Sequence, residues 1–180
     1  RDVYLLSRPE GHIRDIEIAT EDNRIGVRLE GEADISLYDG AGRLLAEQQA
    51  DGEACLTVEN PVPWNAEKPY LYRLVFCSHG EEIRQQVGFV TYEINERGAF
   101  TVNGKEVKLK GVNHHDTHPQ NGYSMTDEEI YRDLEQMKRL NINCIRTSHY
   151  PPAPRFLEYC DRLGFYVMLE TDLEIHGFDN

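Results

Sequence analysis

The residues of this sequence that could do chemistry lie in its second half, in three short polar groups. The groups are residues 113–119 (NHHDTHP), 146–151 (RTSHYP) and 170–177 (ETDLEIHG), and each follows a short apolar segment. An imidazole ring can donate a hydrogen bond from one nitrogen and accept one at the other, which suits sugar hydroxyl groups. A single His-rich loop is usually an ordinary surface feature. The recurrence of polar groups after successive apolar segments indicates one shared binding pocket.

Glu174 and His176 form a pattern that could bind a metal ion. In an extended segment, residues two positions apart project to the same side of the chain. A carboxylate and an imidazole are both ligands of divalent cations. These two ligands leave the site incomplete, so a third would have to come from elsewhere. The alternative is a solvated pair on the surface.

The segment after residue 125 has the signature of a helix. Thr126 and Glu129 form a capping box at its start. Apolar residues then follow at helical spacing, which predicts that one face of the helix packs on a core. These residues are Ile130, Leu134, Met137 and Leu140. A second predicted helix begins at Pro154 and ends at Gly164.

Short apolar segments alternate with these helices and predict a parallel sheet. The segments are 109–113, 142–147 and 165–169. The order β-α-β-α-β is typical of parallel α/β folds, and right-handed connections bring the ends of the strands to one edge. In a (β/α)8 barrel, or TIM barrel, that edge carries the active site. The sequence holds only three such strands. We therefore expect residues 93–180 to be the first part of a barrel, in which at least one outer strand of the sheet lacks a partner strand.

Residues 1–92 follow a different pattern and predict a separate domain. Seven or so short segments of alternating apolar and polar residues are separated by turns rich in Gly, Asn and Asp. This pattern is typical of an antiparallel β-sandwich. Asn103-Gly104, just beyond this domain, predicts a tight hairpin, because both residues tolerate a positive φ.

The composition excludes several classes of partner. With 32 acidic and 19 basic residues the chain has a net charge of −13, which repels nucleic acid backbones. No apolar run approaches the roughly 18 residues that a membrane-spanning helix needs. The four cysteines are scattered and form no CxxC pair. We therefore expect buried, reduced thiols in a cytoplasmic protein rather than a zinc site or a disulfide framework.

The chain resembles a known family in several ordered motifs. Residues 110–119, 145–151 and 169–177 are similar to motifs of bacterial β-galactosidases of glycoside hydrolase family 2. Residues 64–74 resemble the immunoglobulin-like domain that precedes the barrel in that family. The resemblance implies an immunoglobulin-like sandwich over residues 1–92 and the first three βα units of a TIM barrel over residues 93–180. Because the chain starts at Arg1, we expect it to be an internal piece of such an enzyme.

The resemblance also implies roles for the polar groups at the strand ends. His115 and His149 correspond to histidines that contact the galactosyl unit and stabilise its transition state. Asn113 and Arg146 lie beside them as supporting residues at the floor of the pocket. These four residues are the predicted substrate-binding set.

The metal pattern and the catalytic carboxylates are implied by the same resemblance. Glu174 and His176 correspond to ligands of an active-site Mg²⁺, and this motif favours galactosidases over the related glucuronidases. The acid/base and nucleophilic glutamates of the family lie further downstream, so we expect no catalytic residue in this chain and no activity from it alone. The sequence departs from the family at His114, where another basic residue is usual, and at Lys110 and Val90, where arginine is usual.

The predicted reaction of the parent enzyme is retaining hydrolysis of terminal β-D-galactosides such as lactose, by two carboxylates about 5 Å apart. The resemblance also implies a homo-oligomeric parent. One alternative is a family relative that acts on another sugar, such as a β-glucuronidase or a β-mannosidase. Another is a non-catalytic carbohydrate-binding or interaction module, because sandwich domains often serve as scaffolds.

Overall fold

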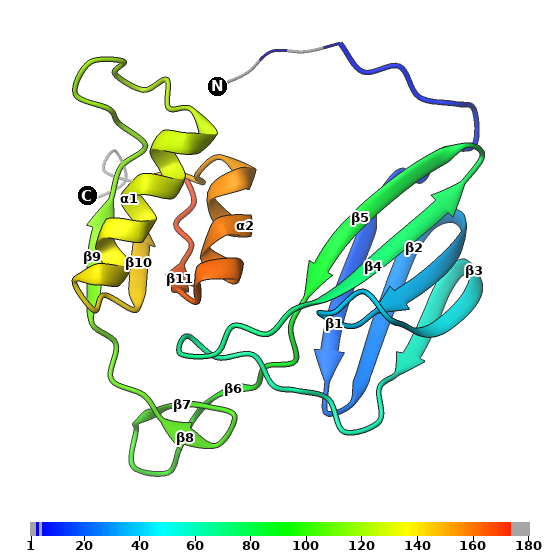
Figure 1. Cartoon of the computed structure of the whole chain (residues 1–180), viewed down its shortest axis with the longest axis horizontal. Coiled ribbons are helices and arrows are strands. Elements are labelled where there is room, and N and C mark those ends of the chain that lie inside the picture. Colours follow the sequence, from blue (N-terminus) through cyan, green and yellow to red (C-terminus); the bar gives the residue numbers. More distant parts are fainter. Residues whose placement is uncertain (1–2, 4, 174–180) are drawn as a thin grey trace, which may run out of the picture. The chain divides into compact units, whose positions relative to one another are not determined.

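The computed structural model describes Val3 and residues 5–173 of the chain. These residues form two compact units, one from Val3 to Val107 and the other from Lys108 onward (Figure 1). Each unit has its own cluster of buried apolar side chains. The two units are therefore described one after the other.

The first unit is built on an antiparallel sheet. Its strands are β1 (Ile16–Glu21), β2 (Arg24–Tyr38), β3 (Leu44–Thr57), β4 (Tyr72–Ser78) and β5 (Glu81–Val87). They are hydrogen-bonded in the order β1-β2-β4-β5, and β3 also pairs with β2. The register between β2 and β3 shifts between Arg28 and Glu32, where Gly31 has a φ of 133°. This break allows β2 to pair with β1 before it and with β4 after it.

The first unit is the immunoglobulin-like β-sandwich that the sequence predicts, but its main sheet has five strands rather than seven or so. The difference arises in β2 and β3, because each continues through a glycine that resembles a turn in the sequence. Alternate residues of β2 are buried, and Ile35 and Leu37 are at most 1% exposed. Leu74 and Phe76 of β4 meet them in the core. Burial of each such side chain contributes about 1.5–3 kcal/mol to folding.

A small hairpin sheet completes the first unit. It consists of β6 (Tyr92–Ile94), β7 (Phe100–Val102) and β8 (Lys105–Glu106). Asn103 and Gly104 form its turn with φ angles of 51° and 73°, so the predicted hairpin is confirmed. Asn103 Nδ2 also donates to the carbonyl oxygen of Trp64 at 2.9 Å, which ties the turn to the loop before β4.

The second unit has the alternating order with which a (β/α)8 barrel begins. Its elements are β9 (Gly111–His114), α1 (Asp127–Arg139), β10 (Cys144–Thr147), α2 (Pro154–Leu163) and β11 (Tyr166–Met168). The strands are parallel in the order β11-β10-β9, with β10 in the centre. Figure 1 shows α1 and α2 beside this sheet. The predicted β-α-β-α-β arrangement is confirmed.

The helix boundaries follow from their capping residues. Thr126 and Glu129 form the predicted capping box of α1. Gly164 closes α2 with a φ of 80°, a conformation that a residue without Cβ adopts at little cost. The prediction that Leu140 lies on the core face of α1 is wrong. Leu140 is the C-cap residue and is 74% exposed, because the helix ends at Arg139.

The core of the second unit lies between the two helices and one face of the sheet. Ile130 and Leu134 of α1 pack with Phe156 of α2 and Ile145 of β10. Leu134, Ile145 and Phe156 are 0% exposed. Neither helix of the described residues has the length and apolar character that crossing a bilayer would require.

Polar side chains join the elements of the second unit where the strands begin. Asn143 accepts a hydrogen bond from Lys110 N at 2.7 Å and donates one to Lys108 O at 3.1 Å. Lys138 Nζ donates to Gly164 O at 2.6 Å, which joins the end of α1 to the end of α2. The amino-terminal edge of the sheet is thus held by contacts that involve none of the predicted site residues.

Candidate functional site

The opposite edge of the sheet brings together the four residues of the predicted substrate-binding set. Asn113 and Arg146 are paired in register on β9 and β10. His115 and His149 lie in the loops that follow these strands, and their ring centroids are 5.5 Å apart. Both histidines are exposed, so both rings are accessible to a ligand.

The register of the sheet explains which of these side chains share a face. Successive residues of a strand project to opposite faces. Ile145 of β10 packs in the core with the helices, so its neighbour Arg146 projects to the other face. Asn113 is the register partner of Arg146 and shares that face, whereas Val112 is the partner of Ile145. Asn113 and Arg146 thus lie on the face that does not pack against α1 and α2.

Glu170, immediately beyond β11, completes the cluster at this edge. Arg146 Nη2 donates to Glu170 Oε1 at 3.0 Å and lies 2.8 Å from Oε2. His149 Nδ1 is 3.3 Å from Glu170 Oε1. The backbone N–H of Glu170 donates to Thr147 Oγ1 at 3.0 Å. One carboxylate is therefore held by contacts with β10 and with the loop that follows it.

The environment of Glu170 favours its ionised form. Burial alone would raise the pKa of this carboxyl group. The hydrogen bonds from His149 and Arg146 and the charge of the guanidinium group outweigh burial, and the pKa of Glu170 is lowered. At neutral pH Glu170 is therefore a carboxylate beside Arg146 and His149.

The contacts of His149 determine which ring nitrogen can meet a ligand. Its Nδ1 atom lies 3.3 Å from Glu170 Oε1 and 3.4 Å from Arg146 Nη2. The ionised carboxylate favours a proton on Nδ1, since an acceptor beside one ring nitrogen selects the tautomer. Arg146 Nη2 is a donor and has its shorter contacts with Glu170, so it does not need Nδ1 as an acceptor. The Nε2 atom of His149 then remains available to accept a hydrogen bond from a ligand.

The loop that carries His115 is joined to the loop that carries His149. The carbonyl oxygen of His114 accepts hydrogen bonds from Ser148 N at 3.1 Å and from Ser148 Oγ at 3.4 Å. Ser148 is 1% exposed, so this link lies inside the unit. The ring of His115 also lies 6.1 Å from the ring of Tyr150, measured between centroids. These contacts hold the two exposed imidazoles near each other.

His114 has a structural environment that differs from that of His115. Its side chain is 6% exposed and stacks on Phe156 with a centroid distance of 4.9 Å. Its Nδ1 lies 3.7 Å from Asp116 Oδ1, and its Nε2 lies 3.9 Å from Asp133 Oδ2. Burial lowers the pKa of His114 although both carboxylates oppose the shift. His114 therefore belongs to the packing between sheet and helices.

This lowered pKa predicts a loss of stability on mild acidification. The pKa of His114 in the folded chain lies below its ordinary value of 6.5, so the unfolded chain binds the proton more readily. The stability from neutral His114 is complete above that value and is lost as the pH falls through the folded-state pKa. Urea unfolding between pH 8 and pH 5 should show a steeper decline for the unaltered chain than for His114→Gln. Equal slopes would mean that His114 does not carry this pH dependence.

The two predicted metal ligands, Glu174 and His176, lie outside the described residues. Within residues 5–173, no group of three or more His, Cys, Asp or Glu side chains is arranged to hold a metal ion. Glu170, the carboxylate at the start of that segment, is engaged by Arg146 and His149. Glu170 is therefore a poor candidate for the third ligand.

Sequence reasoning missed the central position of Glu170 in the cluster. A signal was present, because Glu170 is the first residue after the third apolar segment, and His115 and His149 also lie within two residues of the end of a segment. The partners of Glu170 depend on how the strands pair. Parallel pairing of β10 with β11 places Arg146 beside Met168, two residues before Glu170.

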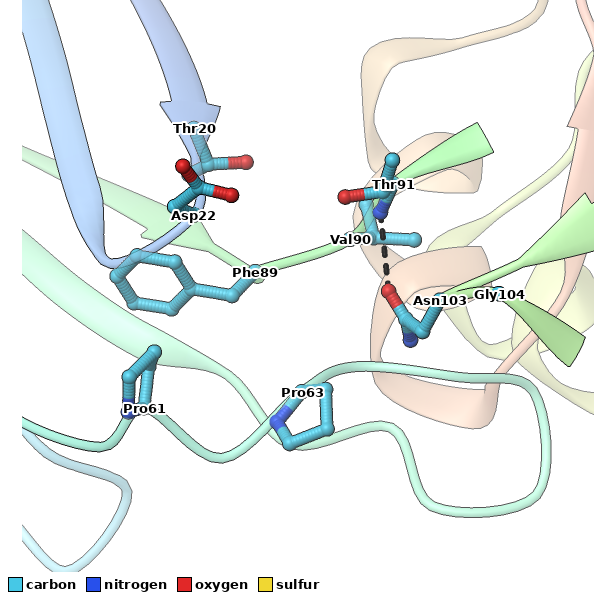
Figure 2. A pocket seen from close by; sticks show the side chains of 9 residues that line it. All are labelled: Thr20, Asp22, Pro61, Pro63, Phe89, Val90, Thr91, Asn103 and Gly104. Carbon is cyan, nitrogen blue, oxygen red and sulfur yellow. Dashed lines mark hydrogen bonds between the residues drawn. The ribbon is translucent and has the colours of Figure 1, made fainter. Parts of the chain in front are cut away.

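A separate pocket of about 310 Å³ lies in the first unit (Figure 2). Phe89, Pro61 and Pro63 form its apolar side, and Asn103 lies across from them. Polar groups of this pocket bind one another, as when Thr91 N donates to Asn103 Oδ1 at 3.0 Å. None of the predicted site residues lines it.

Family models match almost the whole chain. The model described as glycosyl hydrolases family 2 matches residues 12–89. The model described as the TIM barrel domain of glycosyl hydrolases family 2 matches residues 92–180. The two matches meet in the segment between the β5 strand and the hairpin sheet.

Curated relatives and solved structures agree with these matches. The chain is 38% identical to a β-galactosidase of Staphylococcus xylosus and 40% identical to one of Actinobacillus pleuropneumoniae, over 98% of its own length in both cases. It covers only 19% and 18% of those proteins, so it spans about a fifth of their length. A β-glucuronidase structure from Faecalibacterium prausnitzii has a TM-score of 0.83 and 26% identity, covering 91% of this chain and 28% of that one.

Proposed function

The chain belongs to glycosyl hydrolase family 2, and from this premise we propose that it forms the galactosyl-contacting part of a retaining β-galactosidase. Such an enzyme hydrolyses terminal β-D-galactosides such as lactose. The observation that supports this best is the meeting of His115, His149 and Arg146 with Glu170 at one edge of a parallel sheet. The identity of 38–40% to proteins named β-galactosidase supports the sugar.

In the proposed mechanism, the chain's own residues bind and orient the sugar. His149 uses Nε2 toward a hydroxyl group, because Glu170 holds its Nδ1 side. His115 approaches the same region from the neighbouring loop. Hydrogen bonds that strengthen as charge develops on the sugar lower the barrier without direct participation in bond cleavage. His115 and His149 are thus proposed to favour the transition state over bound substrate.

Retaining hydrolysis also needs an acid and a nucleophile, two carboxylates about 5 Å apart on opposite sides of the glycosidic bond. The carboxylates at the described site already have protein partners. Glu170 is paired with Arg146 and His149, and Asp116 accepts a hydrogen bond from Ala153 N. We propose that the reacting carboxylates do not come from the described part of this chain.

The 180-residue chain alone is accordingly expected not to hydrolyse a chromogenic β-galactoside above the background rate. Histidines can orient a sugar, but binding without an acid and a nucleophile gives little rate enhancement. The assay should include His149→Ala, purified in parallel, to reveal any contaminating enzyme. Turnover that is present in the unaltered chain and absent from this variant would place the catalytic pair within these residues.

Titration of methyl β-D-galactoside and methyl β-D-glucuronide into the chain tests the proposed sugar. A glucuronide brings a carboxylate that needs a cation, and the guanidinium at the described site, Arg146, is already paired with Glu170. We therefore expect the galactoside to bind more tightly, and His149→Ala to remove that binding. Tighter binding of the glucuronide would favour the β-glucuronidase alternative suggested by the similar solved structures. Galactoside binding that survives in His149→Ala would favour a carbohydrate-binding module with its site elsewhere.

We also propose that Glu174 and His176 contribute to a Mg²⁺ site. A carboxylate and an imidazole suit a divalent cation, and a bound Mg²⁺ would supply a fixed positive charge next to the sugar. Mg²⁺ prefers octahedral geometry and keeps several waters, so two side chains should bind it only weakly, at about millimolar concentration. The sugar titration should therefore be run with and without Mg²⁺.

The cysteines support a cytoplasmic location for the proposed enzyme. All four are free thiols in the structure. The prediction that they are buried holds for Cys144 and Cys160 and is wrong for Cys55 and Cys77, which are exposed. Burial raises the pKa of both Cys144 and Cys160, which keeps these thiols protonated and unreactive. Such thiols fit a reducing compartment. A homo-oligomeric enzyme stays a prediction from the family resemblance.

A further inference from the structure

The amino terminus of helix α2 donates a hydrogen bond to a residue in a distant loop. Its N-cap residue, Ala153, has no side chain that could cap the helix, and Pro154 follows it. Asp116, in the loop after β9, instead accepts a hydrogen bond from Ala153 N to its Oδ2 atom at 3.1 Å. A carboxylate is favoured at this end of a helix because the free N–H groups and the helix dipole give it partial positive charge.

Asp116 makes further contacts that fix its own position. Its backbone N–H donates to Tyr150 Oη at 3.2 Å. Its Oδ1 atom lies 3.7 Å from Nδ1 of the buried His114. The side chain of Asp116 is 14% exposed. Asp116 is thus hydrogen-bonded to the loop after β10 and to the start of α2, and its side chain lies beside His114 of β9.

His115 lies directly between two residues that are fixed in this way. The preceding residue, His114, is buried and bonded through its carbonyl oxygen to Ser148. The following residue is Asp116. The side chain of His115 itself is exposed, and its described ring contacts are those with His149 at 5.5 Å and Tyr150 at 6.1 Å. The direction of the His115 ring therefore depends on the backbone on either side of it.

We propose that Asp116 is a positioning residue that holds His115 toward His149 by binding the amino terminus of α2. This inference rests on the proposed function, in which both histidines contact the same sugar. A sugar-binding group loses affinity when it must be ordered at the moment of binding. Asp116 removes that cost because its contacts fix the His115 backbone before a ligand arrives.

The competing interpretation is that Asp116 only stabilises α2, and a second substitution separates the two roles. A serine at the N-cap can accept hydrogen bonds from the next N–H groups of the helix, so A153S gives α2 a cap of its own. The full 180-residue chain is compared with D116A, A153S and the double variant D116A/A153S. D116N is the conservative control, because its side-chain oxygen can still accept from Ala153 N.

Two measurements are made on each protein. Thermal unfolding reports helix capping, and NMR of the imidazole groups reports the environment of His115 and its contact with His149. We expect D116A to lower the melting temperature and to shift or broaden the His115 signals with loss of that contact. In D116A/A153S the melting temperature should recover while the His115 signals stay altered. D116N should keep both properties.

The outcomes that would overturn the proposal are equally specific. Recovery of the His115–His149 contact in D116A/A153S would mean that Asp116 acts only through the stability of α2. Unchanged His115 signals in D116A would mean that it has no positioning role. Methyl β-D-galactoside should bind D116A and D116A/A153S roughly tenfold more weakly than the unaltered chain. If the unaltered chain binds no sugar, the proposed function fails, and the NMR contact still decides the role of Asp116.

Discussion

Glu170→Ala is expected to weaken binding of methyl β-D-galactoside by roughly 10–100-fold, the range found when metal-binding histidines lose the carboxylate that orients them. The variant leaves Arg146 without the carboxylate that lies 2.8 Å from its Nη2 atom. It also removes the acceptor beside His149 Nδ1. The guanidinium group is then free to turn toward the sugar or toward His149, and the imidazole loses its preferred tautomer.

Titration calorimetry gives the change in affinity, and NMR of the His149 ring nitrogens gives the tautomer. Glu135→Ala is a matched control, since Glu135 forms an exposed pair with Arg139 on α1 and should change binding little. Glu170→Gln separates charge from shape, because the amide keeps an acceptor oxygen but loses the negative charge. Unchanged sugar affinity in Glu170→Ala, with His149 in its original tautomer, would remove Glu170 from the site.

Phe156→Ala is expected to lower the free energy of unfolding of the second unit by about 3–5 kcal/mol. Phe156 is 0% exposed and packs with Leu134, Ile145 and Cys160. Its ring also stacks on the ring of His114. The variant would therefore remove packing from the end of β9, where the loop that carries His115 begins. A cavity at this position cannot close easily, because rigid elements surround it on several sides.

The two units can be followed separately during urea unfolding. Both helices of the described residues lie in the second unit, so helical circular dichroism reports on it. Trp64 is the single tryptophan of the chain and lies in the first unit. Phe156→Ala should shift the dichroism transition and leave the Trp64 fluorescence transition in place.

The matched control is Phe76→Ala, which removes an equally buried phenylalanine from the core of the first unit. It should shift the Trp64 fluorescence transition and spare the helical signal. If Phe156→Ala shifts both signals together, the two units unfold as one, and separate cores do not give separate stability.

Local signals in the sequence were sufficient to predict much of the second unit. The capping box of Thr126 and Glu129 and the closing Gly164 fixed the helices, since these features act within one turn of the chain. Strand lengths in the first unit were harder to predict. Gly31 resembles a turn in the sequence, but in the sheet it forms a break through which β2 continues. Only pairing with distant strands distinguishes these two cases.

The candidate site was predictable in its location and less so in its contacts. His115 and His149 were identified because polar residues recur where parallel strands end. The neighbouring His114 has the same side chain, but the alternation along β9 buries it against Phe156. The roles of Glu170 and Asp116 depend on partners 21 to 37 residues away in the sequence. Spacing along the chain could not identify such partners.

The separation between the two edges of the second unit has a consequence for how such a domain can evolve. The two candidate sugar-binding histidines, His115 and His149, lie in loops that leave the strands, whereas Asn143 and Lys138 join the elements where the strands begin. Substitutions in the exposed loop positions can alter which glycoside is accepted while the joints at the other edge stay intact. Substitutions of Asn143 or Lys138 can change the thermal stability of the unit without altering its specificity. In the role proposed for it, Asp116 is the exception, because its side chain contacts the start of α2 and it directly follows His115 in the chain.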